Sequence, residues 1–286
     1  MQISDILDRK ETIASCEIFP PKIGSELEHA FEIASKIAEL KPAFISVTCG
    51  AAGNTAVNTG ELAQHIEHTG VPALAHITCV ATPKTEIEAI LDDYQARGIS
   101  NLLALRGDLP KDMAMPGEGH FKHANELVAV IKEHGSFCVG GACYPEGHVE
   151  SANQDEDISY LKQKVDSGCD FLTTQMFFDN NVLYKFLYKL SQKGVNVPVL
   201  AGIMPVTNSV QIKRILELSG TILPSRFQNI IDKFGNNPQA MKQAGIAYAT
   251  EQIIDLIANN VRGIHIYTMN KPDVAEQIMR NLSFIL

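Results

Sequence analysis

The sequence predicts a single-domain (β/α)8 barrel over residues 1–286, and three observations support this. Eight short runs of β-branched and aromatic residues alternate with amphipathic stretches, which is the order of elements in a parallel barrel. The length of 286 residues suits this fold, which needs about 250 residues. No change of composition and no Ser/Gly-rich linker divides the chain. A doubly wound open sheet is the alternative, but eight units in one continuous chain favour the barrel.

The expected strands are short, apolar and followed by loop-forming residues. They span 15–19, 44–49, 73–79, 102–107, 137–144, 171–178, 197–204 and 264–269. Their enrichment in β-branched and aromatic residues is typical of strands.

A helix is expected after each strand. Residues 26–40 place Leu27, Phe31 and Ala34 on one face at helical spacing. A second helix should run to residue 97, with Thr82 as N-cap and Pro83 in the first turn. One further helix is expected to end before Gly168, and two others are expected over 180–192, before Gly194, and over 272–282. Shorter helices are expected after Gly60, His123 and Asn208.

Two segments exceed what a barrel needs. Residues 221–237, together with a helix over 238–260, predict extra helical structure between the seventh and eighth strands. Residues 109–122 are rich in Pro, Gly and Met and lack periodicity. A loop of this length is typical of a lid, a binding loop or a disordered segment.

Composition limits the function. The chain has 33 acidic and 24 basic residues, a formal charge of −9, which argues against nucleic acid and anionic membranes as partners. Phosphorylated ligands remain compatible, because they need only local cations and helix N-termini. No apolar run approaches about 18 residues, residues 1–12 lack a signal-peptide core, and the six cysteines form no C-x-x-C pair. We therefore expect a cytoplasmic protein with reduced thiols.

Polar residues collect near the carboxyl ends of the expected strands, where barrels carry their chemistry. Glu17 and Gln175 lie inside apolar runs, so each needs a partner or a function. Because Ile18 and Phe19 follow Glu17, we expect limited hydration and a raised pKa, as suits a general acid.

Other chemical motifs are absent. The sequence contains no G-x-G-x-x-G, no P-loop and no G-x-S-x-G elbow. The pairs His65/His68 and His120/His123 lack a completing carboxylate or thiolate, so we expect no metal site.

The strand ends together resemble a known family. The segments SCEIFPPK (15–22), ISVTCG (45–50), AHITC (75–79), ALRGDLP (104–110), ACYPEGH (142–148), TQMFFD (174–179), GIMP (202–205) and IHIYTMN (264–270) are similar to signature segments of bacterial 5,10-methylenetetrahydrofolate reductases. They occur in the same order, and the resemblance covers about residues 13–271.

The resemblance implies a non-covalent flavin, FAD or else FMN, that passes a hydride by ping-pong transfer through N5 from NAD(P)H to 5,10-methylenetetrahydrofolate. It implies that Glu17 is the general acid and that Asp108 lies between flavin and pterin. Substrate-binding positions would be Gln175, Tyr267 and Gln211. Flavin-binding positions would be Thr48, His76, Leu105, Arg106, Gly107, Asp108, Ala142, Tyr144, His148, Asp157 and Lys164. Arg106 and Lys164 suit a pyrophosphate, and a homo-oligomer is expected.

Two positions depart from the family pattern. Cys49 stands where better-known members have Tyr, and Ile215 stands where an aromatic residue is expected against nicotinamide or the folate tail. These departures leave open a second hypothesis, in which the chain is a flavin- and folate-binding subunit that takes electrons from an iron–sulfur or flavoprotein partner. A related flavin barrel with another substrate, such as a proline-dehydrogenase-like enzyme, is a third.

Overall fold

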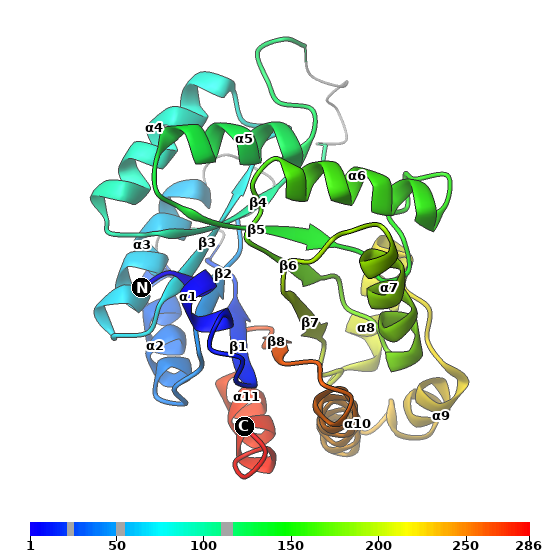
Figure 1. Cartoon of the computed structure of the whole chain (residues 1–286). Helices are drawn as coiled ribbons and strands as arrows, with labels where there is room; N and C mark the ends of the chain where they lie inside the picture. The colour runs from blue at the N-terminus through cyan, green and yellow to red at the C-terminus, as the bar shows by residue number, and fades with distance from the viewer. Residues whose placement is uncertain (22–25, 50–54, 110–116) are drawn as a thin grey trace.

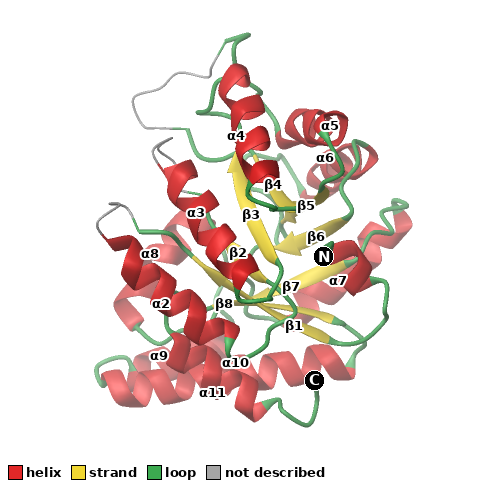
Figure 2. Cartoon of the chain, turned by 90° about the vertical axis from the view of Figure 1, so that its left-hand side faces the viewer, coloured by secondary structure: helices red, strands yellow, loops and turns green. Residues whose placement is uncertain are grey.

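The computed structural model describes residues 1–21, 26–49, 55–109 and 117–286. Eight parallel strands close into a barrel in the order β1 to β8, and helices surround it (Figures 1 and 2). The strands are β1 Ile13–Ile18, β2 Ile45–Val47, β3 Ala73–Thr78, β4 Asn101–Leu105, β5 Cys138–Cys143, β6 Phe171–Thr174, β7 Val199–Ile203 and β8 Gly263–Tyr267. The predicted (β/α)8 barrel is confirmed.

The helices follow the predicted order. They are α1 Ile3–Leu7, α2 Leu27–Ala38, α3 Thr55–His68, α4 Lys84–Ala96, α5 Ala124–His134, α6 Gln154–Asp166, α7 Asn180–Gln192, α8 Ser209–Ser219, α9 Ser225–Phe234, α10 Pro238–Ala258 and α11 Pro272–Asn281. The predicted extra helices between strands seven and eight are α9 and α10. α7 has the predicted bounds, because Asp179 caps its first turn and Gly194 takes a positive φ of 71° after its end.

Most strand ends differ from prediction by a few residues, and three boundary differences have a local structural cause. Pro83, not Thr82, is the N-cap of α4, because Pro83 has an extended ψ of 145° and no side chain caps the helix. α3 begins before Gly60, whose missing side chain lets Tyr94 of α4 approach: a Cβ there would lie 3.0 Å from the Tyr94 ring. β6 ends at Thr174 rather than residue 178, because Met176 and Phe178 leave the barrel to pack in the cluster beside α8, α9 and α10.

The amino-terminal end of the barrel is closed by α1, which the sequence analysis did not predict. Ile3 and Ile6 pack with a buried cluster that includes Phe44, Leu74 and Phe171. Each fully buried isoleucine contributes about 1.5–3 kcal/mol. This end is therefore solid hydrophobic core, and any ligand must enter from the opposite end.

The next layer of the barrel interior is polar. Because strand side chains alternate, residues two positions beyond the apolar cluster point to the same interior. The polar ones are Ser15, Ser46, His76 and Thr173, and His265 is the register partner of Ser15; all five are buried. Glu17 is two residues beyond Ser15 on β1 and belongs to the third layer, at the carboxyl mouth. The second, polar layer therefore lies directly beneath the expected site.

The long loop is described only in part. Residues 110–116 lie outside the described residues, so its predicted role as a lid stays a prediction. Its carboxyl part packs on the start of α4: His120 bridges Pro83, and the ammonium of Lys84 lies 4.9 Å from the centre of the Phe121 ring.

Candidate active site

Glu17 lies near the end of β1, beside Ser46 of β2 and Tyr267 of β8 in the register of the barrel. Its Oε2 is 3.4 Å from Nε2 of His265 and 3.5 Å from Nε2 of His76. The Ser46 hydroxyl donates a 3.5 Å hydrogen bond to the same oxygen. Its side chain is 17% exposed, so the carboxyl group is embedded among polar partners but retains access to the barrel mouth.

The pKa of Glu17 is lowered, not raised as the sequence suggested. Burial raises this pKa, but the hydrogen bond from His265, the charges of His76 and His265 and the Ser46 hydroxyl together outweigh burial. The apolar neighbours in sequence were misleading, because the partners come from other strands. With these partners Glu17 is ionised at neutral pH, and a proton-donor role requires that its neighbours hold the proton.

His76 points into the barrel interior. Its Nε2 is 2.6 Å from the Ser46 hydroxyl, and the residue is only 5% exposed. Burial lowers the pKa of His76 to about 4, although the Glu17 carboxylate opposes this. His76 is therefore neutral at pH 7, and its contact with a flavin stays a prediction.

Gln175 directly follows β6, and Tyr267 ends β8 beside Glu17. Gln175 folds back so that its Oε1 accepts the Met176 N–H at 2.9 Å, which leaves its NH2 group as a donor. The Tyr267 hydroxyl donates a 2.5 Å hydrogen bond to the Thr174 carbonyl. This contact requires Gly202, because a Cβ there would lie 2.6 Å from the hydroxyl. Tyr267 can therefore offer its ring, rather than its hydroxyl, to a substrate.

The predicted flavin residues line the mouth from β2 to α6. Arg106, after β4, binds Glu150 in a two-pronged ion pair, with 2.8 Å between its Nη2 and Oε1, and this hydrogen bond raises the pKa of Arg106. Gly107 adopts a φ of 82°, and a Cβ there would lie 2.9 Å from Thr78. Asp108 is exposed. The backbone after β4 thus passes close to β3 and presents polar groups to the mouth.

A buried cation lies beside β5. The ammonium of Lys164, on α6, donates a 2.7 Å hydrogen bond to the Ala142 carbonyl, and burial lowers its pKa. Burial raises the pKa of nearby Asp157. The rings of Tyr144 and His148 meet edge to face at 4.7 Å. Thr48 and Leu105 lie at the ends of β2 and β4, completing the predicted set around this side.

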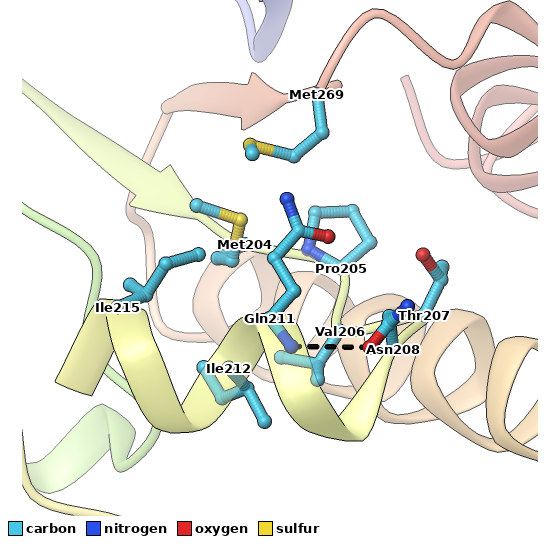
Figure 3. A pocket seen from close by; sticks show the side chains of 9 residues that line it. All are labelled: Met204, Pro205, Val206, Thr207, Asn208, Gln211, Ile212, Ile215 and Met269. Atoms are coloured by element: carbon cyan, nitrogen blue, oxygen red, sulfur yellow. Dashed lines mark hydrogen bonds between the residues drawn. The ribbon is translucent and has the colours of Figure 1, made fainter.

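A small pocket opens after β7 and β8 (Figure 3). The thioethers of Met204 and Met269 face it from the two strand ends, and Ile215 borders it from α8. Gln211 extends its amide over Pro205 into the space between them. The pocket therefore offers an aliphatic wall and the amide of Gln211, with no aromatic ring among its lining residues.

Sequence reasoning missed several site residues. Ser15, Ser46 and Glu150 contact residues of the site but are not themselves predicted from the sequence, although both serines lie in segments of the family pattern. Side chains alternate between the two faces of a strand, so Ser15 points to the same interior as Glu17, and Ser46 does so on the neighbouring strand β2. This alternation could have predicted both serines. Among the described residues, no group of three or more His, Cys, Asp or Glu side chains is arranged to hold a metal ion. No helix within the described ranges is long and apolar enough to span a membrane.

Fold and site together define a (β/α)8 barrel with a histidine-supported carboxyl group at its carboxyl mouth and two cations, Arg106 and Lys164, nearby. The family model of methylenetetrahydrofolate reductase matches residues 2–283. The chain belongs to the methylenetetrahydrofolate reductase family, and the predicted resemblance is confirmed.

Curated relatives agree with this assignment. The chain is 32% identical to the 5,10-methylenetetrahydrofolate reductase of Escherichia coli, covering 94% of this chain and 90% of that protein. It is 34% identical to methylenetetrahydrofolate reductase (NADH) 1 of Arabidopsis thaliana over 99% of this chain. It spans about half the length of the plant relatives, 50% for the Arabidopsis protein.

Solved structures share the fold. A Clostridium thermocellum protein that binds two copies of 5-methyl-5,6,7,8-tetrahydrofolic acid superimposes with a TM-score of 0.73 at 15% identity, covering 100% of both chains. Phosphonopyruvate hydrolase matches with a TM-score of 0.56 at 14% identity, covering 99% of this chain and 86% of that one. At these identities the likeness concerns the barrel fold.

Proposed function

We propose that this chain reduces 5,10-methylenetetrahydrofolate to 5-methyltetrahydrofolate with NAD(P)H, through a bound flavin and in two successive half-reactions. The observation that carries the proposal is Glu17, held by two histidines and a serine at the open end of the barrel. Family membership supports the reaction, and the folate-binding barrel from Clostridium supports the substrate class.

The residues at the mouth fit a flavin. The Arg106 guanidinium already holds a carboxylate in two-pronged fashion, and phosphate oxygens use the same geometry. Lys164 supplies a second, buried cation, and Asp157 supplies a carboxylate suited to a ribose hydroxyl. Two cations favour FAD, which has a pyrophosphate, over FMN. When bound, the flavin would supply the hydride carrier that no side chain can provide.

The protein's own groups have distinct roles. Glu17 delivers a proton to a nitrogen of the folate five-membered ring, which opens the ring to an iminium that can accept a hydride. Asp108 places a negative charge at the mouth, which disfavours an anionic reduced flavin and accepts hydrogen bonds from the pterin. The free NH2 group of Gln175 and the amide of Gln211 orient the substrate, while Ile215 offers only aliphatic contact to the nicotinamide or folate tail.

The two half-reactions separate these roles. We expect Glu17→Gln to retain flavin and its reduction by NADH, but to slow flavin reoxidation by methylenetetrahydrofolate by about 10²–10⁴-fold, the usual contribution of a general acid. Glu28→Gln, an exposed position on α2, is the matched control and should behave as wild type. Equal loss in both half-reactions of Glu17→Gln would remove Glu17 from the proton-donor role.

The partner-subunit hypothesis remains a second candidate because of Ile215. A pocket without an aromatic ring among its lining residues offers nicotinamide no stacking partner there. Anaerobic mixing of the purified flavoprotein with NADH or NADPH decides between the hypotheses. Bleaching within seconds supports the stand-alone enzyme, whereas a flavin that stays oxidised with both nucleotides supports a protein electron donor.

A further inference from the structure

We propose that His265 is a positioning residue that holds, against Glu17, the single proton consumed in each turnover, with Ser15 setting the orientation of that proton. The fate of the proton rests on the proposed function, whereas the shared proton itself rests on the hydrogen bonds of the barrel interior. His265 does not face the mouth: it is 1% exposed and lies one layer beneath Glu17.

The hydrogen bonds around Ser15 determine which nitrogen of His265 carries a proton. The Ser15 hydroxyl donates to the Ile264 carbonyl at 3.1 Å. Its oxygen lies 2.8 Å from Nδ1 of His265. We assign the single hydroxyl proton to the Ile264 carbonyl, so that the Ser15 oxygen accepts and Nδ1 of His265 donates. In a neutral His265, Nε2 therefore bears a lone pair.

That lone pair faces Glu17. Nε2 of His265 is 3.4 Å from Oε2 of Glu17, so two acceptors would oppose each other if the imidazole were neutral and the carboxyl group ionised. One proton between them removes the conflict, as imidazolium with carboxylate or as imidazole with carboxylic acid. The pair therefore retains one proton under conditions in which an isolated glutamate would have lost it.

Packing prevents the ring from escaping this arrangement. The Phe44 ring stacks on His265 with centroids 5.9 Å apart, and the Tyr267 ring meets it edge-on at 5.4 Å. A ring flip would break the Ser15 contact. The imidazole is thus held between Phe44, which belongs to the apolar cluster at the amino-terminal end of the barrel, and Tyr267 at the carboxyl end.

The other groups that face the pair do not hold this proton. His76 on β3 is neutral at pH 7, since burial lowers its pKa to about 4. Ser46 on β2 donates to Glu17 and contacts His76. Burial and the Glu17 charge raise the pKa of Tyr267 well above its ordinary value, and its hydroxyl is bonded to a backbone carbonyl. His265 is the partner with a nitrogen that needs the proton.

The proton balance matches the reaction. Conversion of methylenetetrahydrofolate and NAD(P)H to methyltetrahydrofolate and NAD(P)⁺ takes up one proton. In our scheme the Nε2–H bond of His265 breaks as the O–H bond of Glu17 forms, and this O–H bond breaks as the N–H bond of the folate forms. The pair is left as neutral imidazole and carboxylate, and water at the mouth restores the proton after product leaves.

The pH profile of the folate half-reaction tests the role of His265. In His265→Gln the side chain can donate to Glu17 but cannot hold an exchangeable acid proton. We expect the rate of flavin reoxidation to begin its decline with rising pH at a pH at least one unit lower than in wild type. Above that pH the rate should drop tenfold per pH unit. Flavin reduction by NADH should keep its wild-type rate. His134→Gln, on the outer helix α5 where His134 contacts Asp92 at 3.1 Å, is the matched control and should leave both profiles unchanged.

Ser15→Ala is a gentler second variant, in case His265→Gln folds poorly. Without the Ser15 oxygen, neutral His265 can carry its proton on Nε2 and donate it to the carboxylate, so the pair no longer needs the shared proton. We expect the same downward shift of the pH profile. Unshifted profiles in both variants would overturn the proposal.

Nitrogen NMR of the full chain with ¹⁵N-labelled histidine tests the shared proton without any folate chemistry. We expect a protonated Nδ1 in His265 throughout the titration, and a common transition for Nε2 and the Glu17 carboxyl carbon that disappears in Glu17→Gln. An unprotonated Nδ1, or an Nε2 transition unchanged by Glu17→Gln, would overturn the proposal. If the NMR result is as expected but wild type never reoxidises with folate, the proposed function fails and the shared proton stands.

Discussion

Gly245 of α10 packs against the loop that borders the pocket beside Gln211, and Gly245→Ala tests this packing. A Cβ at this position would lie 1.8 Å from the Val206 carbonyl oxygen, where no real Cβ atom comes closer than about 3 Å. The loop after β7 must therefore move by about 1 Å or more. This loop carries Asn208, whose side chain accepts from the first N–H groups of α8, and it leads to Gln211.

The magnitude follows from two opposing effects. Alanine is favoured over glycine inside a helix by about 1 kcal/mol, while overpacking costs about 1–3 kcal/mol and more when backbone must move. We expect overpacking to dominate, with a net loss of about 2 kcal/mol. For a chain of this size that lowers Tm by about 3 °C.

Calorimetry and steady-state kinetics measure both consequences of Gly245→Ala. We expect a lower Tm and a several-fold higher KM for folate. Flavin affinity should be unchanged, because the predicted flavin-binding residues lie between β2 and α6 and not on the loop after β7. Gly119→Ala is the control, since a Cβ there meets nothing within 4 Å. A Tm of Gly245→Ala equal to or above wild type would refute the packing argument.

Three further predictions concern single side chains. Asn208→Ala removes the cap of α8 and should cost about 1 kcal/mol in urea unfolding. Burial lowers the pKa of His76 from 6.5 to about 4, so between these pH values the unfolded chain binds a proton that the folded chain does not. The free energy of unfolding should therefore fall by up to about 3 kcal/mol as the pH drops from 6.5 to about 4. Unfolding of His76→Gln, measured over the same pH range, should lack this loss of stability. Lys164→Met should weaken flavin binding about tenfold or more, measured by quenching of flavin fluorescence; unchanged affinity would exclude Lys164 from the flavin site.

The sequence predicts the barrel because each strand is a separate local signal. The run before Gln175, FLTT, combines apolar and β-branched residues, and α7 has its own N-cap in Asp179 and a glycine after its end. Boundaries fail where tertiary packing decides them, as at Gly60, which tolerates a helix because Tyr94 fills the space beside it. Helix α1, which closes the amino-terminal end of the barrel, is five residues long and is too short to show a periodic pattern in the sequence.

The candidate site is predicted as positions but not as contacts. Glu17 and His265 are 248 residues apart, and only closure of β1 against β8 brings them together. The pKa of Glu17 was predicted in the wrong direction for this reason: the local sequence is apolar, whereas the partners across the barrel are histidine and serine. Resemblance to a family supplies the positions, and the three-dimensional contacts supply the proton chemistry.

The central claim is that folate reoxidises a flavin in this barrel with a proton from the Glu17 pair. The direct test is an anaerobic stopped-flow experiment, in which wild type and Glu17→Gln are reduced with NADH or dithionite and then mixed with methylenetetrahydrofolate. We expect the oxidised flavin spectrum to return in wild type, and to return at least about 100-fold more slowly in Glu17→Gln. A reduced wild-type flavin that persists in the presence of folate, or equal rates in the two proteins, would contradict it.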